Sequence, residues 1–346
     1  MKRVEEFKVT DKRVLVRCDF NVPVDGAGNV LDDFRIKKTL PTIQCLVKNG
    51  AKIILMSHLG EPNGMVTASL SLDKVKERLE ELLSISIIKT DDCVGDNVQK
   101  QVSILGQGQV LLLENLRFHQ EETDNDVMFA KKLSLLGDIY INDAFSDCHR
   151  AHASIVGIPK FLPSGAGLLL QREIERLNNV LQDPKKPMVA LVGGIKVSAK
   201  AKFIEKISAI ADTVIVNGPV KKEIMEKNIT FTYPEKVMGP SDNFDALDIN
   251  NEFIDICKEK ILTAKTVVWN GPFGKFEDAR YKKGTLEIAK AIIESDAYSV
   301  AGGGETVEFL THEGMLDNFS HICTGGGAML DYLSGEELPG LKALES

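Results

Sequence analysis

The 346-residue sequence contains no run of about 20 apolar residues, the length needed to cross a bilayer. Its first residues are charged and include no apolar secretion core, so we expect a cytoplasmic protein. Six widely spaced cysteines form no C-x-x-C pair, which argues against zinc and a disulfide framework. The sequence also has no excess of basic residues: it contains 42 Lys and Arg and 50 Asp and Glu. We therefore expect neither nucleic acid nor a membrane as partner, and an anionic substrate needs a local cluster of positive charge.

The sequence also lacks the common signatures of nucleotide-binding enzymes. It contains no Walker sequence G-x-x-x-x-G-K-[ST], no complete G-x-G-x-x-G and no H-R-D loop. These absences argue against a P-loop protein, a dinucleotide-binding enzyme and a protein kinase. His149 and His152 resemble a pair of metal ligands, but no third ligand stands at a suitable spacing, so we expect no metal there.

Short apolar runs alternate with amphipathic segments along the chain. Most runs are uninterrupted, which is typical of parallel strands buried on both faces. Strand and helix in alternation predict an α/β fold of doubly wound parallel sheets. The predicted strands are Val14–Cys18, Lys52–Met56, Val110–Leu113, Ile139–Ile141, Met188–Val192, Thr213–Val216, Thr266–Trp269 and Tyr298–Ala301, and the clearest helical patterns are Leu72–Leu83, Asp126–Leu136, Phe253–Ile261 and Gly284–Glu294.

One boundary divides the chain. The helical pattern Leu168–Leu181 is followed by Gln182–Pro187, which contains two prolines, and a new strand starts directly afterwards. The chain is long enough for two ordinary domains. We expect one lobe over residues 1–170 and a second over residues 187–330, joined by a hinge helix and linker over residues 171–186.

Charged side chains follow the predicted strands of the first lobe. Ligands of open α/β sheets bind beyond the carboxyl ends of strands, and arginine presents a fork of donors that matches phosphate and carboxylate oxygens. A single arginine is usually a solvated surface residue, but here five strand ends contribute to one set. We expect this set to neutralise a small, highly charged anion: Arg17, Arg35, His58, Arg117, His149, Arg150 and His152.

The strand ends of the second lobe carry glycine instead. Glycine lets backbone amides approach phosphate oxygens closely, and a helix N-terminus adds partial positive charge. Lys196 and Lys200 follow one glycine pair where a strand enters a helix. A solvated i, i+4 pair is the ordinary interpretation, but the preceding glycines favour a role in neutralising a migrating phosphoryl group. The glycine clusters that predict this nucleotide site are Gly193–Gly194, Gly302–Gly304 and Gly325–Gly327.

Nine segments resemble, in order and spacing, the motifs of the phosphoglycerate kinase family. The likeness runs from about residue 10 to Leu344 and is highly specific for the family. The segments of the first lobe are Arg17–Pro23, Asp33–Ile36, Ser57–Gly60, Leu113–Phe118 and His149–Ser154, and those of the second are Gly193–Ser198, Val268–Pro272, Gly302–Thr306 and Thr324–Ala328.

The resemblance implies two Rossmann-like lobes joined by a hinge, with 3-phosphoglycerate bound by the first and a Mg²⁺-nucleotide by the second. Residues 331–346 would pack back on the first lobe. The implied enzyme is a monomeric phosphotransferase with a carboxyl group as acceptor. It would transfer a phosphoryl group reversibly between 1,3-bisphosphoglycerate with ADP and 3-phosphoglycerate with ATP, in glycolysis and gluconeogenesis.

The resemblance also assigns roles to residues. Arg35, Lys196 and Lys200 would be catalytic, Glu277 would bond the ribose hydroxyls, and Glu305 would bind Mg²⁺. The residues implied for the acid phosphate are Asp19, Asn21, Arg35, His58, Arg117 and Arg150. Those implied for the nucleotide are Gly193, Gly194, Lys196, Lys200, Asn270, Pro272, Glu277, Gly302, Gly303, Gly304, Glu305 and Thr306.

Several positions depart from the family pattern. Glu61 replaces an arginine, so we expect it to repel the substrate and to compete for the neighbouring arginines. Ser146–Cys148 replaces Gly-Thr-Ala, Ala199 replaces an aspartate between the lysines, and Glu305 replaces a metal-binding aspartate. The segment that would form one side of the adenosine-binding pocket is reduced to Asn217–Val220, which predicts weak binding of Mg-ATP.

Two hypotheses follow from these departures. The first is an active phosphoglycerate kinase with an abbreviated nucleotide lobe. The alternative is a non-catalytic relative that binds the acid phosphate, or a protein partner, as a sensor. Retention of Arg35 and both lysines favours the enzyme, because changes in an inactive relative fall on catalytic charges as readily as on the adenosine pocket.

Overall fold

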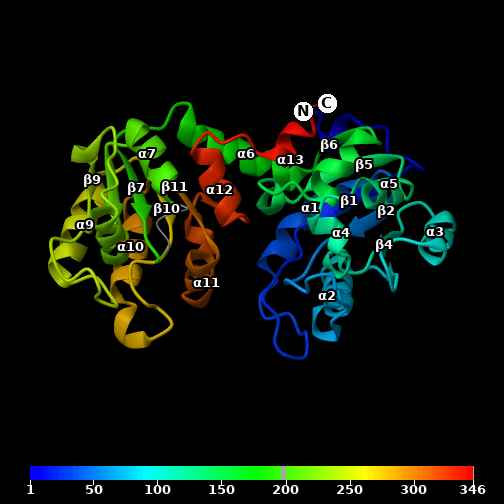
Figure 1. Ribbon diagram of the computed structural model, residues 1–346, viewed down its shortest axis with the longest axis horizontal. Coiled ribbons are helices and arrows are strands. Elements are labelled where there is room, and N and C mark those ends of the chain that lie inside the picture. Colours follow the sequence, from blue (N-terminus) through cyan, green and yellow to red (C-terminus); the bar gives the residue numbers. More distant parts are fainter. Residues whose placement is uncertain (196–199, 346) are drawn as a thin grey trace. The chain divides into compact units, whose positions relative to one another are not determined.

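The structure is a computed structural model, and it describes residues 1–195 and 200–345 (Figure 1). The chain divides into two compact units. Unit 1 comprises Met1–Arg172 and Glu337–Ser346, and unit 2 comprises Glu173–Glu336. The division falls inside helix α6 (Leu168–Leu181). The carboxylate of Asp143 accepts hydrogen bonds from the amides of Leu169 and Leu170, and so satisfies donors at the start of this helix.

Unit 1 is built on a six-stranded sheet. Every neighbouring pair is parallel, and the strand order is β3-β4-β2-β1-β5-β6. The strands are β1 (Arg13–Cys18), β2 (Lys52–Met56), β3 (Ile87–Lys89), β4 (Val110–Leu112), β5 (Ile139–Asp143) and β6 (Ser164–Ala166).

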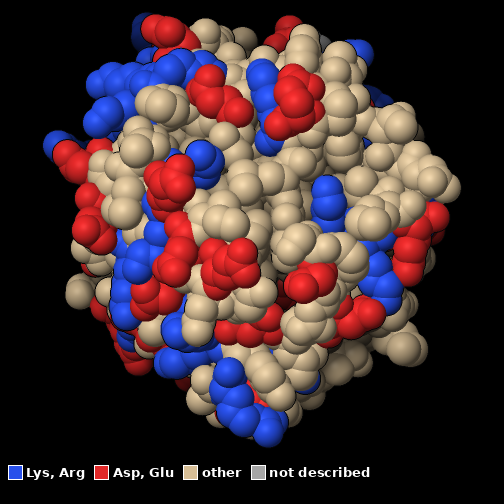
Figure 2. Space-filling view, turned by 90° about the vertical axis from the view of Figure 1, so that its left-hand side faces the viewer, with Lys and Arg blue, Asp and Glu red and all other residues tan. Residues whose placement is uncertain are grey.

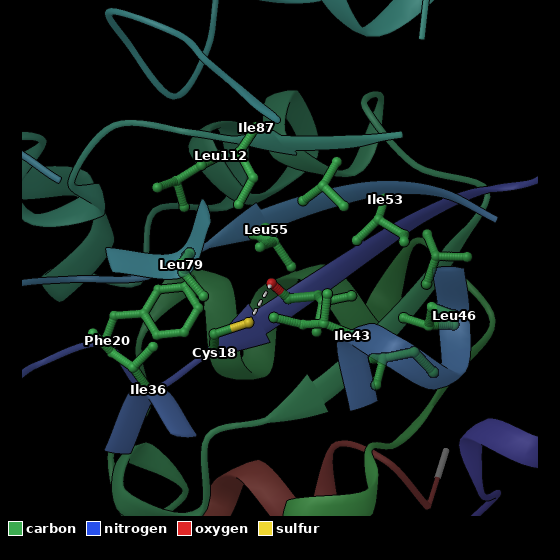
Figure 3. Packing of buried hydrophobic residues seen from close by; sticks show 14 of the residues in the cluster. Cys18, Phe20, Ile36, Ile43, Leu46, Ile53, Leu55, Leu79, Ile87 and Leu112 are labelled. Carbon is green, nitrogen blue, oxygen red and sulfur yellow. Dashed lines mark hydrogen bonds between the residues drawn. The ribbon is translucent and has the colours of Figure 1, made fainter. Parts of the chain in front are cut away.

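Helices that alternate with the strands along the chain pack on this sheet. Those that connect strands are α1 (Phe34–Lys48), α2 (Asp73–Leu83), α3 (Asp96–Ser103), α4 (Gln120–Thr123) and α5 (Val127–Ser134). The core between β1, β2, β4 and helices α1 and α2 is apolar and fully buried, as Figure 3 shows around Cys18, Ile43 and Leu55. Near the C-terminus, α13 (Pro339–Lys342) returns to unit 1, where the amide of Gly340 donates to the carbonyl of Cys148 over 2.8 Å.

Unit 2 repeats the plan with a second parallel sheet, in the order β12-β11-β10-β7-β8-β9. Its strands are β7 (Met188–Val192), β8 (Thr213–Val216), β9 (Val237–Met238), β10 (Thr266–Asn270), β11 (Tyr298–Gly302) and β12 (His321–Ile322). Its helices are α7 (Ala201–Ile210), α8 (Gly218–Glu226), α9 (Asn251–Thr263), α10 (Lys283–Glu294), α11 (Gly304–His312) and α12 (Gly326–Leu333). Helices α9 and α10 pack against each other, and so do α7 and α12 (Figure 1).

The predicted fold class is therefore confirmed. All eight predicted strands are present, with ends that differ by no more than two residues. Four further strands, β3, β6, β9 and β12, escaped prediction, and each lies at an edge of its sheet. The four strands have only two or three residues each, too few for an apolar run to stand out.

Within the described residues, no helix combines the length and the apolar character that crossing a membrane requires. On the face seen in Figure 2, lysine and arginine side chains are interspersed with aspartate and glutamate. That face therefore offers no broad field of positive charge to a polyanion.

Candidate active site

Charged side chains of unit 1 meet at the carboxyl edge of its sheet. Asp19 follows β1 directly, His58 follows β2, Arg117 follows β4, and Asp147 lies in the turn after β5. Because parallel strands end at the same edge, residues far apart in the sequence become neighbours there.

Arg35, in the first turn of α1, is joined to the segment after β1. Its Nη1 atom donates to the Asp19 carboxylate over 3.2 Å and to the carbonyl of Asn21 over 3.1 Å. Asp19 is fully buried and also accepts from the hydroxyl of Ser146 over 2.5 Å. Burial raises the pKa of Asp19, and the charge of Arg35 opposes this rise. The side chain of Arg35 stays partly exposed, with 27% of it accessible to solvent.

Arg117 and Arg150 converge on Glu61. Oε1 of Glu61 lies 2.5 Å from Nη1 of Arg117 and 3.6 Å from Nη1 of Arg150. Arg117 also donates to the carbonyl of Gly60, whose amide donates to the side chain of Asn21. The structure thus brings the acid-phosphate candidates Asn21, Arg117 and Arg150 into one cluster, with Glu61 between the last two.

His58 lies on the buried side of this cluster. Its Nδ1 atom is 3.0 Å from Nη2 of Arg17 and 3.6 Å from Oδ2 of Asp147. Burial lowers the pKa of His58 well below its usual range, and the neighbouring arginines lower it further although Asp147 opposes them. The imidazole is therefore neutral near pH 7 and acts through hydrogen bonding rather than through charge.

The expectation that Arg17 faces a ligand is wrong. Arg17 is completely buried, its Nη2 atom lies 3.2 Å from Oδ2 of Asp147, and its Nε atom donates to the hydroxyl of Ser154. Glu122 accepts from the same hydroxyl. Although burial opposes it, Asp147 and Glu122 raise the pKa of Arg17. Its positive charge is thus balanced inside the protein and is not available to a substrate.

In unit 2, the glycines after β7 pack against the segment after β10. The amide of Gly193 donates to the carbonyl of Asn270, and that of Gly194 donates to the carbonyl of Pro272. A Cβ atom on Gly193 would lie only 2.1 Å from the Pro272 carbonyl oxygen, so this approach requires glycine. The predicted residues Gly193, Gly194, Asn270 and Pro272 therefore lie together.

Lys200 returns to the same glycine pair. Its ammonium group donates to the carbonyl of Gly193, and a Cβ atom on Gly194 would lie 2.7 Å from Nζ. Burial lowers the pKa of Lys200, and the carboxylate of Glu305 opposes this. The predicted partner Lys196 and the substituted Ala199 lie outside the described residues.

The glycines after β11 lead into helix α11. Gly303 precedes the helix with φ of +105°, a conformation that favours glycine, and the side chain of Asn270 donates to the carbonyl of Gly302. Thr306 is buried, and its hydroxyl accepts from the amide of Gly271. Gly304 and Glu305 are exposed at the start of the helix, whose N-terminus attracts negative charge. Glu277 is exposed in the segment after β10, and no described hydrogen bond links its side chain to these glycines.

Sequence reasoning missed several groups of these clusters. The sequence shows Asp147 only as a departure from a family motif and does not predict its place between Arg17, His58 and Arg117. Asn217 belongs to the segment that the sequence shows as shortened, yet its side chain donates to the carbonyl of Gly194 and accepts from the amide of Val220 at the start of α8. An Asn directly after a strand and before a helical pattern is a capping signal that the sequence does carry.

The fold and these clusters define a class: a doubly wound α/β protein with an arginine-rich edge on one sheet and a glycine-rich, lysine-bearing edge on the other. Comparison with known proteins gives the family. The phosphoglycerate kinase family model matches residues 4–231 and 220–336. A phosphoglycerate kinase of Anaeromyxobacter dehalogenans is 40% identical over 393 residues, covering 100% of this chain and 99% of that protein. One of Moorella thermoacetica is 40% identical over 386 residues, with 99% and 98% covered.

Solved structures agree with this assignment. The phosphoglycerate kinase of Pyrococcus horikoshii superposes with a TM-score of 0.89 at 30% identity, covering 100% of this chain and 98% of that one. That of Coxiella burnetii gives a TM-score of 0.83 at 31% identity, with 99% and 98% covered. The chain belongs to the phosphoglycerate kinase family. Since the first alignment spans 393 positions and this chain has 346 residues, the relatives have residues at dozens of positions where this chain has none.

Proposed function

We propose that this chain is an active phosphoglycerate kinase. It transfers a phosphoryl group reversibly between 1,3-bisphosphoglycerate and ADP on one side and 3-phosphoglycerate and ATP on the other, a step of glycolysis and gluconeogenesis. One observation carries the proposal: the similarity to phosphoglycerate kinases extends over the whole chain. Two contacts support it, the pair Arg35–Asp19 and the contact of Lys200 with Gly193.

Unit 1 holds the acid phosphate in this proposal. Asp19 fixes Arg35, and Asn21 is fixed by the amide of Gly60, so these side chains are ordered before the substrate binds. Arg117 and Arg150 supply donors in the fork geometry that suits phosphate. His58 is neutral and adds a hydrogen bond without further charge.

Unit 2 holds the nucleotide. The carbonyl and amide groups of Gly193 and Gly194 form a compact turn with Asn270 and Pro272, and Gly302, Gly303 and Gly304 lead into the N-terminus of α11. A Cβ atom on Gly304 would meet nothing within 4 Å, so the backbone at the start of α11 is open to phosphate oxygens, whereas the glycines after β7 shape the turn beside it. Thr306 supports this turn through its bond to Gly271, and Glu277 is the candidate for the ribose hydroxyls.

Glu305 suits a magnesium ion that accompanies the nucleotide. It is an exposed carboxylate in the first turn of α11, beside Lys200. Magnesium usually keeps several waters and is bound through one or two carboxylates together with substrate phosphates, so a single carboxylate fits that donor set. When bound, the ion neutralises charge on the nucleotide phosphates.

Phosphoryl transfer requires little from the protein beyond positioning the two substrates and stabilising negative charge. An in-line transfer develops negative charge on the oxygens of the migrating group, and preorganised donors stabilise that charge more than the charge of the ground state. Arg35 provides such donors from the acid-phosphate side, and Lys200 provides an ammonium group from the nucleotide side. We infer the same role for Lys196 from its motif position.

The alternative, a non-catalytic sensor of the acid phosphate, has less support. The relatives that cover the whole chain are named as kinases, and both Arg35 and Lys200 remain in contact with the groups that would orient them. We further propose that the protein acts as a cytoplasmic monomer.

A coupled spectrophotometric assay tests the proposal directly. Purified protein is supplied with 3-phosphoglycerate, Mg²⁺ and a panel of nucleoside triphosphates, and the formation of diphosphate is followed. We expect turnover with at least one triphosphate and none without Mg²⁺. Binding of 3-phosphoglycerate with no turnover on any nucleotide would instead support the sensor.

A further inference from the structure

Two carboxylates of unit 1 lie inside its arginine cluster. Oδ2 of Asp147 is 3.2 Å from Nη2 of Arg17, and Oδ1 of Asp147 is 4.0 Å from Nη2 of Arg117. Glu61 approaches Arg117 through the other terminal nitrogen, at 2.5 Å from Nη1, and also lies 3.6 Å from Arg150. Arg117 is therefore held between two negative charges before any ligand arrives.

The two carboxylates differ in how firmly they are placed. The side chain of Asp147 is 4% exposed, whereas that of Glu61 is 62% exposed. Burial alone would raise the pKa of Asp147, but the positive charges of Arg17, Arg117 and Arg150 around it hold that pKa far below its usual range. Asp147 is thus a fixed, ionised group. Glu61 is the exposed partner of the buried Arg117 and the partly exposed Arg150, so its carboxylate can leave these pairs for water at a lower cost than the buried Asp147 could.

The charges around the cluster nearly cancel. Four arginines (Arg17, Arg35, Arg117 and Arg150) face the carboxylates of Asp19, Asp147, Glu61 and Glu122. His58 and His152 add little positive charge, because burial lowers the pKa of both. Nevertheless Nε and Nη2 of Arg117 are buried, and neither atom has a hydrogen-bond partner among the residues that the structure describes. Unsatisfied buried donors of a charged group are costly, so these two atoms indicate a ligand that the site has still to receive.

We propose that Glu61 is a resident anion, which an acid phosphate displaces from Arg117 and Arg150 while Asp147 stays in place and holds Arg117. The proposal rests on the proposed function, because the ligand class is that of the proposed substrate. It makes Glu61 a determinant of specificity. A ligand must pair with both arginines better than a carboxylate does. A phosphate monoester, with nearly two charges and three acceptor oxygens, meets this requirement, and a singly charged acid does not.

Calorimetric titration of the full-length protein tests this inference. The probes are 3-phosphoglycerate and inorganic phosphate, and the proteins are the wild type, Glu61→Gln and Glu121→Gln. Glu121 lies exposed on α4 of the same unit, so its variant makes the same change of charge outside the cluster. We expect Glu61→Gln to bind both probes roughly tenfold more tightly, as expected when a charge-assisted contact no longer has a competitor, and Glu121→Gln to match the wild type. Equal or weaker binding of both probes by Glu61→Gln overturns the inference.

The coupled assay on the same variants separates this inference from the proposed function. If the wild type turns over and Glu61→Gln gains no affinity, the inference fails and the function stands. If Glu61→Gln gains affinity for both probes, but neither the wild type nor Glu61→Gln transfers a phosphoryl group, the inference stands and the proposed function fails. If neither variant binds either probe, the inference is overturned as well.

Discussion

Nη1 of Arg35 lies 3.2 Å from each carboxylate oxygen of Asp19, a buried residue that the hydroxyl of Ser146 also contacts. A guanidinium fixed in this way is oriented before the substrate binds. If it stabilises charge that develops only during transfer, Arg35→Ala lowers kcat by roughly 100- to 1,000-fold with little change in KM.

Steady-state kinetics with the coupled assay check this split, and Arg150→Ala is the matched control. Arg150 is 39% exposed and has no described contact with Asp19, so its loss is expected mainly to raise KM for the acid phosphate. An unchanged kcat in Arg35→Ala would remove that residue from the mechanism.

Lys200 carries a charge that the folded protein disfavours, because burial lowers its pKa. Replacing the ammonium by an apolar group of similar length removes this penalty. We therefore expect Lys200→Met to abolish phosphoryl transfer with every nucleotide and also to raise the stability of unit 2. Denaturant unfolding followed by the fluorescence of Trp269, the only tryptophan and a fully buried one, measures the second effect. A loss of stability would mean that the bond to Gly193 outweighs the burial of charge.

Near the proposed nucleotide site of unit 2, the chain after β8 is closely packed. The backbone of Phe244 packs on Gly218 at the start of α8, where a Cβ atom would lie 2.6 Å from the Phe244 carbonyl oxygen. The cavity beside it, lined by Gly218, Asp248 and Phe273 among others, has a volume of about 30 Å³, room for about two water molecules.

Selectivity for a base requires a shaped pocket with placed polar groups. We therefore expect weak binding of Mg-ATP and dissociation constants for ATP and GTP within about fivefold of each other. Calorimetric titration of both triphosphates decides this. A strong preference for ATP would show that other residues form an adenine pocket.

Asp147 provides a test of stability rather than of activity. Asp147→Asn removes the carboxylate nearest to the buried charge of Arg17 and leaves only the more distant Glu122 and Asp19 to balance it, and the expected loss is about 3 kcal/mol of unfolding free energy. Asp91→Asn, at an exposed position of the same unit, is the control and should change little. In the double variant Arg17→Met/Asp147→Leu both charges are gone, so we expect part of the loss to be recovered in denaturant titrations. A single variant as stable as the wild type would contradict the ion pair.

His152 makes the stability of the fold depend on pH. Burial lowers its pKa to about 4, below the value of about 6.5 in an unfolded chain. Between these values the unfolded state binds more protons than the folded state, so the contribution of His152 is complete above pH 6.5 and is lost as the pH falls towards 4. His152→Gln should flatten the stability profile in this window, by no more than about 3 kcal/mol. Unfolding curves at several pH values measure the slope, and an unchanged slope would assign the pH dependence to other groups.

The sequence predicts the central strands well and the edge strands poorly, for a physical reason. A central parallel strand is covered on both faces, so Met188–Val192 or Lys52–Met56 must be apolar throughout. Edge strands need less cover. Ser164–Ala166 has no apolar run at all, and its middle residue is a glycine because a Cβ atom there would lie 2.6 Å from the ring of Phe7.

The site shows the same limit. A positively charged side chain at a strand end contacts a ligand only if no other segment of the chain already pairs with it and covers it. Arg17 is covered by Asp147 and Ser154, which lie more than 120 residues later in the chain. A local sequence motif contains no information about such a long-range contact. Arg35, by contrast, pairs with Asp19, which lies only 16 residues away in the sequence. A local sequence motif was therefore enough to predict that Arg35 belongs to the cluster.

The return of α13 to unit 1 has a consequence for synthesis on the ribosome. Gly340 lies so close to Cys148 and Ile155 that a Cβ atom would be 2.8 Å from each, and both Leu338 and Leu344 are buried. Unit 1 thus lacks part of its packing until these residues have been translated and have left the exit tunnel. Unit 2 is complete in the chain before that point. The unit whose synthesis begins first is therefore the last to be finished, and a released chain that ends at residue 336 contains all of unit 2 but lacks the segment that completes unit 1.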